Sequence, residues 1–342
     1  MQQLTYTGPN ALEWRDVAEP RLDSERAALV RPVAVATCDL DALIIGGESP
    51  FPGPFPIGHE CVAEVLDAGD TAASSLTAGQ LVSVPFQISC GECAPCRRGR
   101  TGNCVSVDFM STYGFGPAVG RWGGFLSETV LVPYAEHMLV PLPDGVSAAA
   151  VASASDNIAD AWRAVAPPLA EEPGAPVLVV GGASSGSIGL YAAAIALALG
   201  AESVTYVDAD AHRREIGAQF GAQTLALADA PQRLGPFPVT VDACAEPEGL
   251  ALALRSTAPD GTCTSTAIYF GDQPTLPLLE MYTKCVTFKT GRAHARPAMP
   301  RVLSLVAEGS LAPERVTTHT VAWGDAADAL LERDWTKLVI ER

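Results

Sequence analysis

The segment Val177–Gly189 reads VLVVGGASSGSIG, an apolar run followed by a glycine-rich loop and the beginning of a helical stretch. Glycines permit a tight turn there and let backbone amides approach a pyrophosphate at the N-terminal end of the helix. The loop is irregular, because Ser184 replaces the first glycine of the dinucleotide-binding fingerprint if Gly186 and Gly189 are its second and third. A plain turn between a strand and a helix is the alternative. We expect a dinucleotide to contact Gly182, Ser184, Gly186, Ser187, Ile188 and Gly189.

An acidic residue ends the next apolar run, about 20 residues after the loop. Asp208 closes the segment VTYVD, residues 204–208, where a carboxylate can bind both hydroxyls of an adenosine ribose. The same carboxylate would repel a 2′-phosphate, so the pattern favours NAD over NADP. Arg213 lines the same adenosine pocket in one interpretation. In the other, Arg213 and Arg214 form a solvated helix face.

Apolar runs on both sides of this loop predict how the chain is divided. Six runs alternate with helical stretches and predict a doubly wound parallel sheet, at residues 177–180, 204–207, 224–227, 239–242, 263–268 and 286–290. The N-terminal part instead alternates short valine-rich runs with glycine and proline, which is typical of many short strands. The tail has two predicted helices, at 299–308 and 325–332, and a strand at 337–340. We predict an α/β protein with a β domain at 1–147, completed by 291–342, and a nucleotide-binding domain at 148–290.

Four of the nine cysteines lie close together in the sequence. They follow the spacing C-x2-C-x2-C-x7-C, at Cys90, Cys93, Cys96 and Cys104. Four thiolates can enclose one zinc ion in a closed tetrahedral site, which leaves no position for a substrate. An iron–sulfur cluster, which four cysteines also bind, is the alternative. The zinc interpretation predicts a structural site that does no chemistry.

Composition limits the partners and the compartment. The chain has 342 residues and a formal net charge of -17, which argues against nucleic acid as a partner. We find no apolar run of about 18 residues and no basic segment followed by an apolar run at the N-terminus, so a membrane span or secretory signal is not expected. The same features favour a cytoplasmic protein. An odd number of cysteines without a secretory segment argues against a disulfide scaffold and favours metal binding or catalysis.

Taken together, these motifs resemble the zinc-dependent medium-chain alcohol dehydrogenase family along essentially the whole chain. The resemblance rests on the four-cysteine spacing, on Gly58-His59-Glu60 upstream, on the glycine loop and on the closing segment from Lys337 to Ile340. It implies a GroES-like β domain that is interrupted by a Rossmann domain and completed by the C-terminal tail. It also implies that the four clustered cysteines bind a structural zinc ion.

The same resemblance implies a second, catalytic zinc ion held by residues far apart in the sequence. Its ligands would be Cys38, His59 and Asp156, with Glu60 as an acid beside the metal that binds it in some relatives. A thiolate, an imidazole and a carboxylate leave the fourth position open, as a catalytic zinc requires. Taken alone, each of the three also fits an ordinary structural role, as a small core residue, a buried histidine or a helix cap.

The sequence departs from this family in its proton relay. Relatives carry a serine or threonine two residues after the zinc cysteine and a histidine nearby, whereas this chain has Leu40 and Leu43, which cannot transfer a proton. Asp160 stands where relatives often carry a threonine that touches the nicotinamide. We expect either proton release through water, assisted by Asp39 or a catalytic Asp160, or a different reaction.

The predicted activity is hydride transfer between NAD(H) and an alcohol or carbonyl compound. Leu40, Leu43 and Trp122, with the loop PFPGPFP at 50–56, indicate an apolar pocket and therefore a hydrophobic alcohol, ketone or aldehyde. The alternatives are a polyol or sugar dehydrogenase, a reductase of activated C=C or C=N bonds, and a non-catalytic NAD-binding relic of the fold. We expect a homodimer or homotetramer, with the run at 286–290 pairing across a two-fold axis, and no membrane or nucleic-acid partner.

Overall fold

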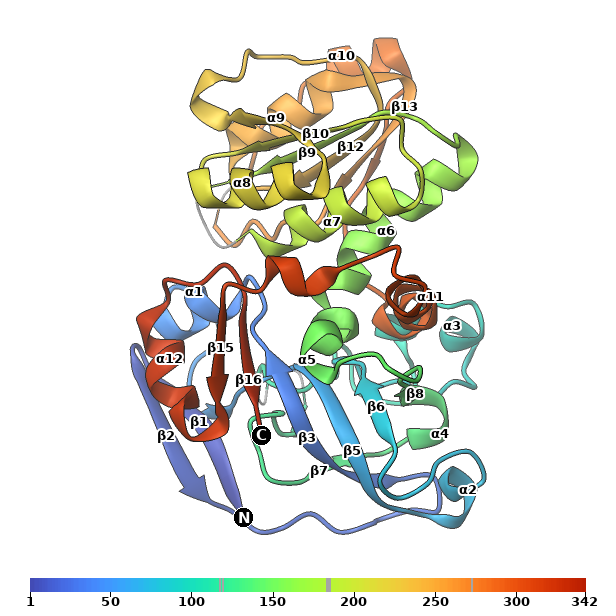
Figure 1. The fold of residues 1–342 in the computed structure, drawn as a ribbon, viewed down its shortest axis with the longest axis vertical. Helices are drawn as coiled ribbons and strands as arrows, with labels where there is room; N and C mark the ends of the chain where they lie inside the picture. Colours follow the sequence, from blue (N-terminus) through green and yellow to red (C-terminus); the bar gives the residue numbers. More distant parts are fainter. Residues whose placement is uncertain (117, 119, 183–185, 272) are drawn as a thin grey trace. The chain divides into compact units, whose positions relative to one another are not determined.

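The computed structural model describes residues 1–116, 118, 120–182, 186–271 and 273–342. It divides into two compact units (Figure 1). Unit 1 comprises Met1–Ala159, Ala293–Gly309 and Thr317–Arg342, and unit 2 comprises Asp160–Arg292 and Ser310–Val316. The units differ from the predicted domain ranges chiefly in residues 148–159 and 310–316, and those ranges stay a prediction. Ser184 lies outside the described residues.

Unit 1 is built on two β-sheets. The larger has the strand order β15-β16-β3-β5-β6-β8, with β7 paired to β3 (Figure 1). Its strands are β3 (Ala28–Ala36), β5 (Glu60–Ala68), β6 (Leu81–Val84), β7 (Val130–Val132), β8 (Val140–Pro141), β15 (His319–Ala322) and β16 (Leu338–Glu341). The smaller sheet has the order β2-β1-β4, and its strands are β1 (Gln2–Gly8), β2 (Ala11–Asp16) and β4 (Phe55–Pro56).

The C-terminal strand completes the larger sheet. Strand β16 runs antiparallel to β3, with Val339 opposite Ala36. Leu338 is fully buried, and its amide donates a hydrogen bond to Thr37 Oγ1 at 3.0 Å. Lys337 donates through Nζ to the carbonyl oxygen of Thr37. The end of the chain therefore reaches the segment that follows β3, where Cys38 lies.

Short helices and 3-10 turns connect the strands of unit 1. The helices are α1 (Asp41–Gly46), α2 (Asp70–Ala73), α3 (Ala94–Arg97), α4 (Ala135–Met138), α5 (Ala148–Val151), α11 (Ala295–Ala307) and α12 (Ala326–Glu332). The 3-10 turns are η1 (Thr101–Asn103), η3 (Ala152–Ser155) and η6 (Trp323–Asp325). The two helices predicted in the tail are observed as α11 and α12. An apolar cluster that includes Val30, Cys61 and Leu338 forms the core of the unit.

Unit 2 contains a six-stranded parallel sheet with the order β11-β10-β9-β12-β13-β14. The first strand of the unit thus lies in the middle, and the chain winds outward in both directions, which confirms the predicted doubly wound sheet. Every residue of β9 is buried, as expected for a central parallel strand. The strands are β9 (Val177–Gly181), β10 (Val204–Asp208), β11 (Gln223–Ala226), β12 (Phe237–Ala243), β13 (Thr257–Ser265) and β14 (Thr287–Lys289).

The helices of unit 2 cover both faces of its sheet (Figure 1). Helices α7 (Ser187–Ala198) and α8 (Ala211–Phe220) lie on one face, and α9 (Pro247–Ser256) and α10 (Leu278–Lys284) on the other. The unit also has the 3-10 turns η4 (Leu227–Asp229) and η5 (Pro313–Val316). Helix α6 (Asn157–Glu171) begins in unit 1 and continues in unit 2. None of the helices that the structure describes has both the length and the apolar character needed to cross a bilayer.

Replacing Leu338 by alanine should destabilise unit 1, because it leaves a cavity beside β3 in the core. We expect the free energy of unfolding to fall by about 2–5 kcal/mol, measured by chemical denaturation. Glu341→Ala, on the exposed end of the same strand, is the matched control and should change it by less than about 0.5 kcal/mol. Equal effects of the two substitutions would contradict the position of β16.

Candidate active site and metal centres

Three residues from distant parts of unit 1 meet at one point. Cys38 follows β3, His59 precedes β5, and Asp156 lies between η3 and α6. One ligand atom from each lies within 4.8 Å of the other two. The turn before His59 requires glycine, because Gly58 has a φ of 93° and a Cβ there would lie 2.8 Å from the amide nitrogen of Leu126. The local backbone therefore aims the imidazole at the other two side chains.

The surroundings of the His59 imidazole suit a bound cation. The residue is fully buried, yet among the described residues neither ring nitrogen has a hydrogen-bond partner. Nε2 lies 3.3 Å from a carboxylate oxygen of Asp156. Buried polar atoms without a partner are costly, and coordination of a metal ion by one nitrogen would remove that cost. A thiol, an imidazole and a carboxylate are also the donor types that zinc takes.

The electrostatics of the site favour a positive charge as well. Burial raises the pKa of the Cys38 thiol well above its ordinary value, and the charges of Asp156 and Glu60 raise it further. Burial alone would lower the pKa of His59, but the carboxylates of Asp41 and Asp156 outweigh it and raise that pKa. A thiolate at Cys38 therefore needs a compensating cation.

Asp41 is a site residue that the sequence reasoning missed. Its carboxylate is buried, accepts a hydrogen bond from the Cys38 amide at 2.7 Å, and lies 3.7 Å from Nδ1 of His59. It thus contacts one candidate ligand and adjoins the other, as partners of metal-binding histidines do. The available signal was an acid three residues after a cysteine, which is also an ordinary feature of a first helical turn.

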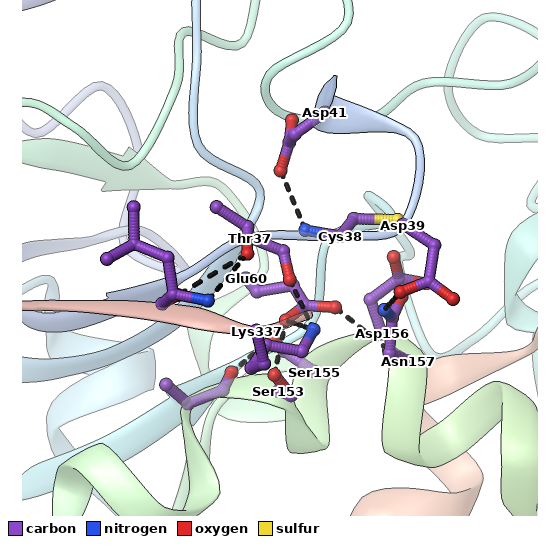
Figure 2. A network of polar contacts seen from close by, with 12 residues as sticks. Thr37, Cys38, Asp39, Asp41, Glu60, Ser153, Ser155, Asp156, Asn157 and Lys337 are labelled. Carbon is purple, nitrogen blue, oxygen red and sulfur yellow. Dashed lines mark hydrogen bonds and ion pairs between the residues drawn. The ribbon is translucent and has the colours of Figure 1, made fainter. Parts of the chain in front are cut away.

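The carboxylate of Glu60 forms an ion pair and hydrogen bonds with other residues of unit 1, as Figure 2 shows. Lys337 Nζ lies 3.1 Å from Oε2, Ser153 Oγ donates to the same oxygen at 2.5 Å, and the amide of Asn157 donates to Oε1 at 3.1 Å. Both charged groups are fully buried. Burial raises the pKa of Glu60 to about 7, and the charge of Lys337 opposes that rise. Glu60 is outside the three-residue ligand group, and its predicted role as a metal ligand stays a prediction.

Lys337 was also missed, although lysine is rare in this chain. The chain has three lysines, and this one is fully buried. A lysine at the beginning of the last strand carried no signal by itself, because its partner lies at the other end of the sequence. The contact with Glu60 arises only when β16 pairs with β3.

The two acids considered for proton transfer differ in their surroundings. Asp39 Oδ1 accepts a hydrogen bond from Asn157 Nδ2 at 3.3 Å. Asp160 instead forms an ion pair with Arg163 on the same helix. Arg163 also donates to the carbonyl oxygens of Ser265, at 3.1 Å, and Gly291, at 2.6 Å. The charge of Asp160 is thereby balanced, and its catalytic role stays a prediction.

Aromatic rings surround His59. The ring centroid of Phe115 lies 4.3 Å from that of His59, and the ring of Phe86 lies 6.1 Å away. Phe51 packs on Phe115 at 5.6 Å. Phe55, from the same loop as Phe51, is buried against Tyr6 in the core. Sequence reasoning did not assign Phe86 or Phe115 to the site, because nothing in their local sequence relates them to His59.

The predicted pocket residues belong to the apolar core of unit 1. Leu40 is a buried member of that cluster, and Leu43 and Trp122 are partly buried against it. Leu40 follows Cys38 and Asp39 directly in the sequence, and its side chain has no group that can transfer a proton. The assignment of these three side chains to a substrate pocket stays a prediction.

The four clustered cysteines form a second group in unit 1. One sulfur from each lies within 4.8 Å of the other three, and the Sγ atoms of Cys93 and Cys104 are 3.8 Å apart, which is far beyond a disulfide bond. Burial alone would raise the pKa of Cys90, but donors from Ser106 Oγ and from nearby backbone amides lower it to about 6. The geometry therefore fits four thiol ligands around one ion.

The residues predicted to bind the nucleotide lie around the carboxyl ends of β9 and β10 in unit 2. A Cβ at Gly182 would lie 2.5 Å from the carbonyl oxygen of Cys244, so glycine is required there. Ser187, Ile188 and Gly189 form the first turn of α7, which Gly186 precedes. Asp208 is fully buried and Arg213 is 5% exposed. The solvated-face interpretation is therefore wrong for Arg213.

Two family models match the chain. The alcohol dehydrogenase GroES-like domain matches residues 24–144, and the zinc-binding dehydrogenase matches residues 187–308. The first lies in unit 1, and the second covers most of the parallel sheet of unit 2. Together with the strand order, these matches confirm the predicted GroES-like and Rossmann folds.

Individual relatives agree with these matches. A glutathione-independent formaldehyde dehydrogenase of Pseudomonas aeruginosa is 30% identical over 223 residues, which cover 61% of this chain and 54%, about half, of the relative. A probable zinc-binding alcohol dehydrogenase of Mycobacterium tuberculosis is 26% identical over 333 residues, 96% of this chain and 84% of the relative. The solved structure of an alcohol dehydrogenase from Thermus sp. ATN1 has a TM-score of 0.87 at 27% identity and covers 100% of this chain and 99% of its own.

Replacing Cys93 by serine should lower the bound zinc by one ion per chain, because it removes one of four thiolates. The midpoint of thermal unfolding should fall with it, since a structural ion stabilises the fold that binds it. Elemental analysis and a thermal melt check both effects. Cys285→Ser, at an exposed cysteine, is the control and should change neither. A wild-type zinc content in Cys93→Ser would refute the assignment.

Replacing Lys337 by methionine should leave the Glu60 carboxylate buried without its cation. We expect a loss of about 3–5 kcal/mol in the free energy of unfolding, measured by chemical denaturation. The double variant Glu60→Gln with Lys337→Met should recover most of that loss, because no charge is then unpaired. Lys289→Met, at an exposed lysine, serves as the control. A double variant as unstable as Lys337→Met would contradict the ion pair.

Proposed function

Because the chain belongs to the zinc-dependent medium-chain alcohol dehydrogenase family, we propose that it transfers a hydride between NAD(H) and an alcohol or carbonyl compound. It is an oxidoreductase of that family. The proposed enzyme holds one catalytic and one structural zinc ion per chain. NAD is the proposed cofactor in preference to NADP.

The observation that carries the proposal is the buried imidazole of His59. Both of its nitrogens lack a hydrogen-bond partner among the described residues, and the Cys38 thiol and the Asp156 carboxylate lie beside it. A relic that had lost its chemistry would have no reason to retain such a costly arrangement. The site therefore supports an enzyme over the non-catalytic alternative.

Each residue of the candidate site has a separate proposed role. When bound, zinc would act as a Lewis acid toward the oxygen of the substrate. Cys38, His59 and Asp156 would hold it, and Asp41 would fix the Cys38 backbone. The pair of Glu60 with Lys337 keeps a further buried carboxylate neutralised near the ligands. Hydride transfer itself requires the nicotinamide, which the protein binds and orients.

The chain's own residues also suggest the route of the proton and the class of substrate. The charge of Asp160 is balanced by Arg163, and Asp39, which accepts a hydrogen bond from Asn157, is the proposed acceptor for a proton relayed through water. The aromatic rings around His59 favour a hydrophobic alcohol, ketone or aldehyde.

The proposed assembly is a homodimer or a homotetramer. Strand β14 lies at the edge of its sheet, and the neighbouring helix α10 exposes Leu278, Leu279 and Tyr282. An open edge beside exposed apolar side chains suits pairing with a second copy. The proposed compartment is the cytoplasm, where thiols that bind metal stay reduced.

A panel of alcohols with NAD and with NADP, followed by the absorbance of the reduced cofactor, tests this proposal. Asp156→Asn should lower kcat/KM by at least ~100-fold and reduce the zinc content by one ion, because it removes a ligand. Asp144→Asn, at an exposed acid, is the control and should behave as wild type. Tight NAD binding with one zinc ion and no turnover on any substrate would favour the relic instead.

A further inference from the structure

The carboxylate of Asp208 is already occupied by other residues of unit 2. Its oxygens accept hydrogen bonds from the Asp210 amide at 2.8 Å and from the Tyr206 hydroxyl at 2.5 Å. Arg213 Nε lies 3.0 and 3.1 Å from the two oxygens, and its Nη2 lies 2.8 Å from Oδ1. Since each oxygen offers two lone pairs, little acceptor capacity remains for the hydroxyls of a ribose.

Arg213 also lies against Gly182 and Gly186, which belong to the loop between β9 and α7. Its Nη2 donates to the carbonyl oxygen of Gly182, and a Cβ at Gly186 would lie 2.9 Å from its Nε. The guanidinium therefore lies against both Gly182 and Gly186 of the predicted nucleotide-binding loop. A ribose that binds the Asp208 carboxylate has to displace the Arg213 guanidinium.

The rest of the arrangement allows such a displacement. The backbone of Arg213 is fixed, because Asp210 caps α8 by accepting from the Arg213 amide at 2.8 Å. Only the side chain has to rotate. Asp208 keeps its contacts with Tyr206 and with the amide of Asp210 when the guanidinium leaves, so it remains a hydrogen-bonded carboxylate.

We propose that Arg213 determines the choice between NAD and NADP in this chain. In the free protein it covers the ribose-binding carboxylate of Asp208, so NAD binds only when the ion pair opens. The released guanidinium then lies beside the 2′ position, where it can pair with a phosphate. The proposal rests on the proposed use of a dinucleotide cofactor. It implies that the chain discriminates against NADP less strongly than Asp208 alone would.

Binding of two small probes isolates this effect from turnover. Adenosine 5′-monophosphate and adenosine 2′,5′-bisphosphate differ only in the 2′-phosphate, and calorimetric titration measures the Kd of each. Arg213→Gln should lower the Kd of the monophosphate by about three- to ten-fold, because the Asp208 carboxylate is then accessible without the opening of an ion pair. It should weaken the bisphosphate by about ten-fold, because a charge-assisted contact is lost.

Arg214→Gln provides a matched control on the same helix. Arg214 donates to the backbone oxygens of Asp208 and Ala209, at 2.8 and 2.9 Å. Removing it changes the net charge equally, so the ratio of the two Kd values should stay within about two-fold of wild type. Asp208→Asn is a second variant, useful if Arg213→Gln fails to fold in a thermal melt. It should weaken the monophosphate and tighten the bisphosphate.

The outcomes separate this inference from the proposed function. Opposite shifts of the two probes in Arg213→Gln or in Asp208→Asn support it. Equal shifts of both probes, or none, overturn it while leaving nucleotide binding intact. Binding of neither probe to the wild-type protein would overturn the inference together with the proposed cofactor.

Discussion

The burial of several acidic groups at one point of unit 1 is the constraint on which the candidate site depends. Cys38, His59 and Asp156 converge there, and the carboxylates of Asp41 and Glu60 are buried close by. Lys337 neutralises Glu60, and the remaining carboxylates lie near a histidine whose nitrogens have no hydrogen-bond partner in the described part of the chain. Buried charges require a compensating charge or a metal ion. A cation at this point would supply that charge.

Residues close together in the sequence were easier to assign to a site than residues that meet only in the folded chain. The four cysteines from Cys90 to Cys104 and the loop after β9 lie in short segments, so their spacing predicted a metal site and a nucleotide-binding turn, each with an alternative that the resemblance to the family disfavoured. The three candidate ligands were assigned by resemblance, because no local pattern links Cys38 to Asp156. Lys337 and Phe115 were missed, since each acquires its role only through a partner far away in the sequence.

The apolar runs predicted the fold better than they predicted the contacts between side chains. Continuous apolar strands predicted the parallel sheet of unit 2, because burial on both faces leaves no alternation. The pairing of Asp208 with Arg213 was not predicted, although both residues were assigned to the cofactor site. An acid at the end of a strand indicates a ribose partner only when its oxygens are available. The described partners of the Asp208 carboxylate all lie within five residues of it, but residue spacing does not fix the side-chain conformations that bring them together.

The most direct test of the account is an anomalous difference map of the zinc-loaded protein, recorded on both sides of the zinc absorption edge. We predict two peaks per chain, one among the four clustered sulfurs and one in contact with Cys38 Sγ, a His59 nitrogen and an Asp156 oxygen, at about 2.0–2.3 Å. A map with a peak at the clustered sulfurs and none between those three side chains would contradict it.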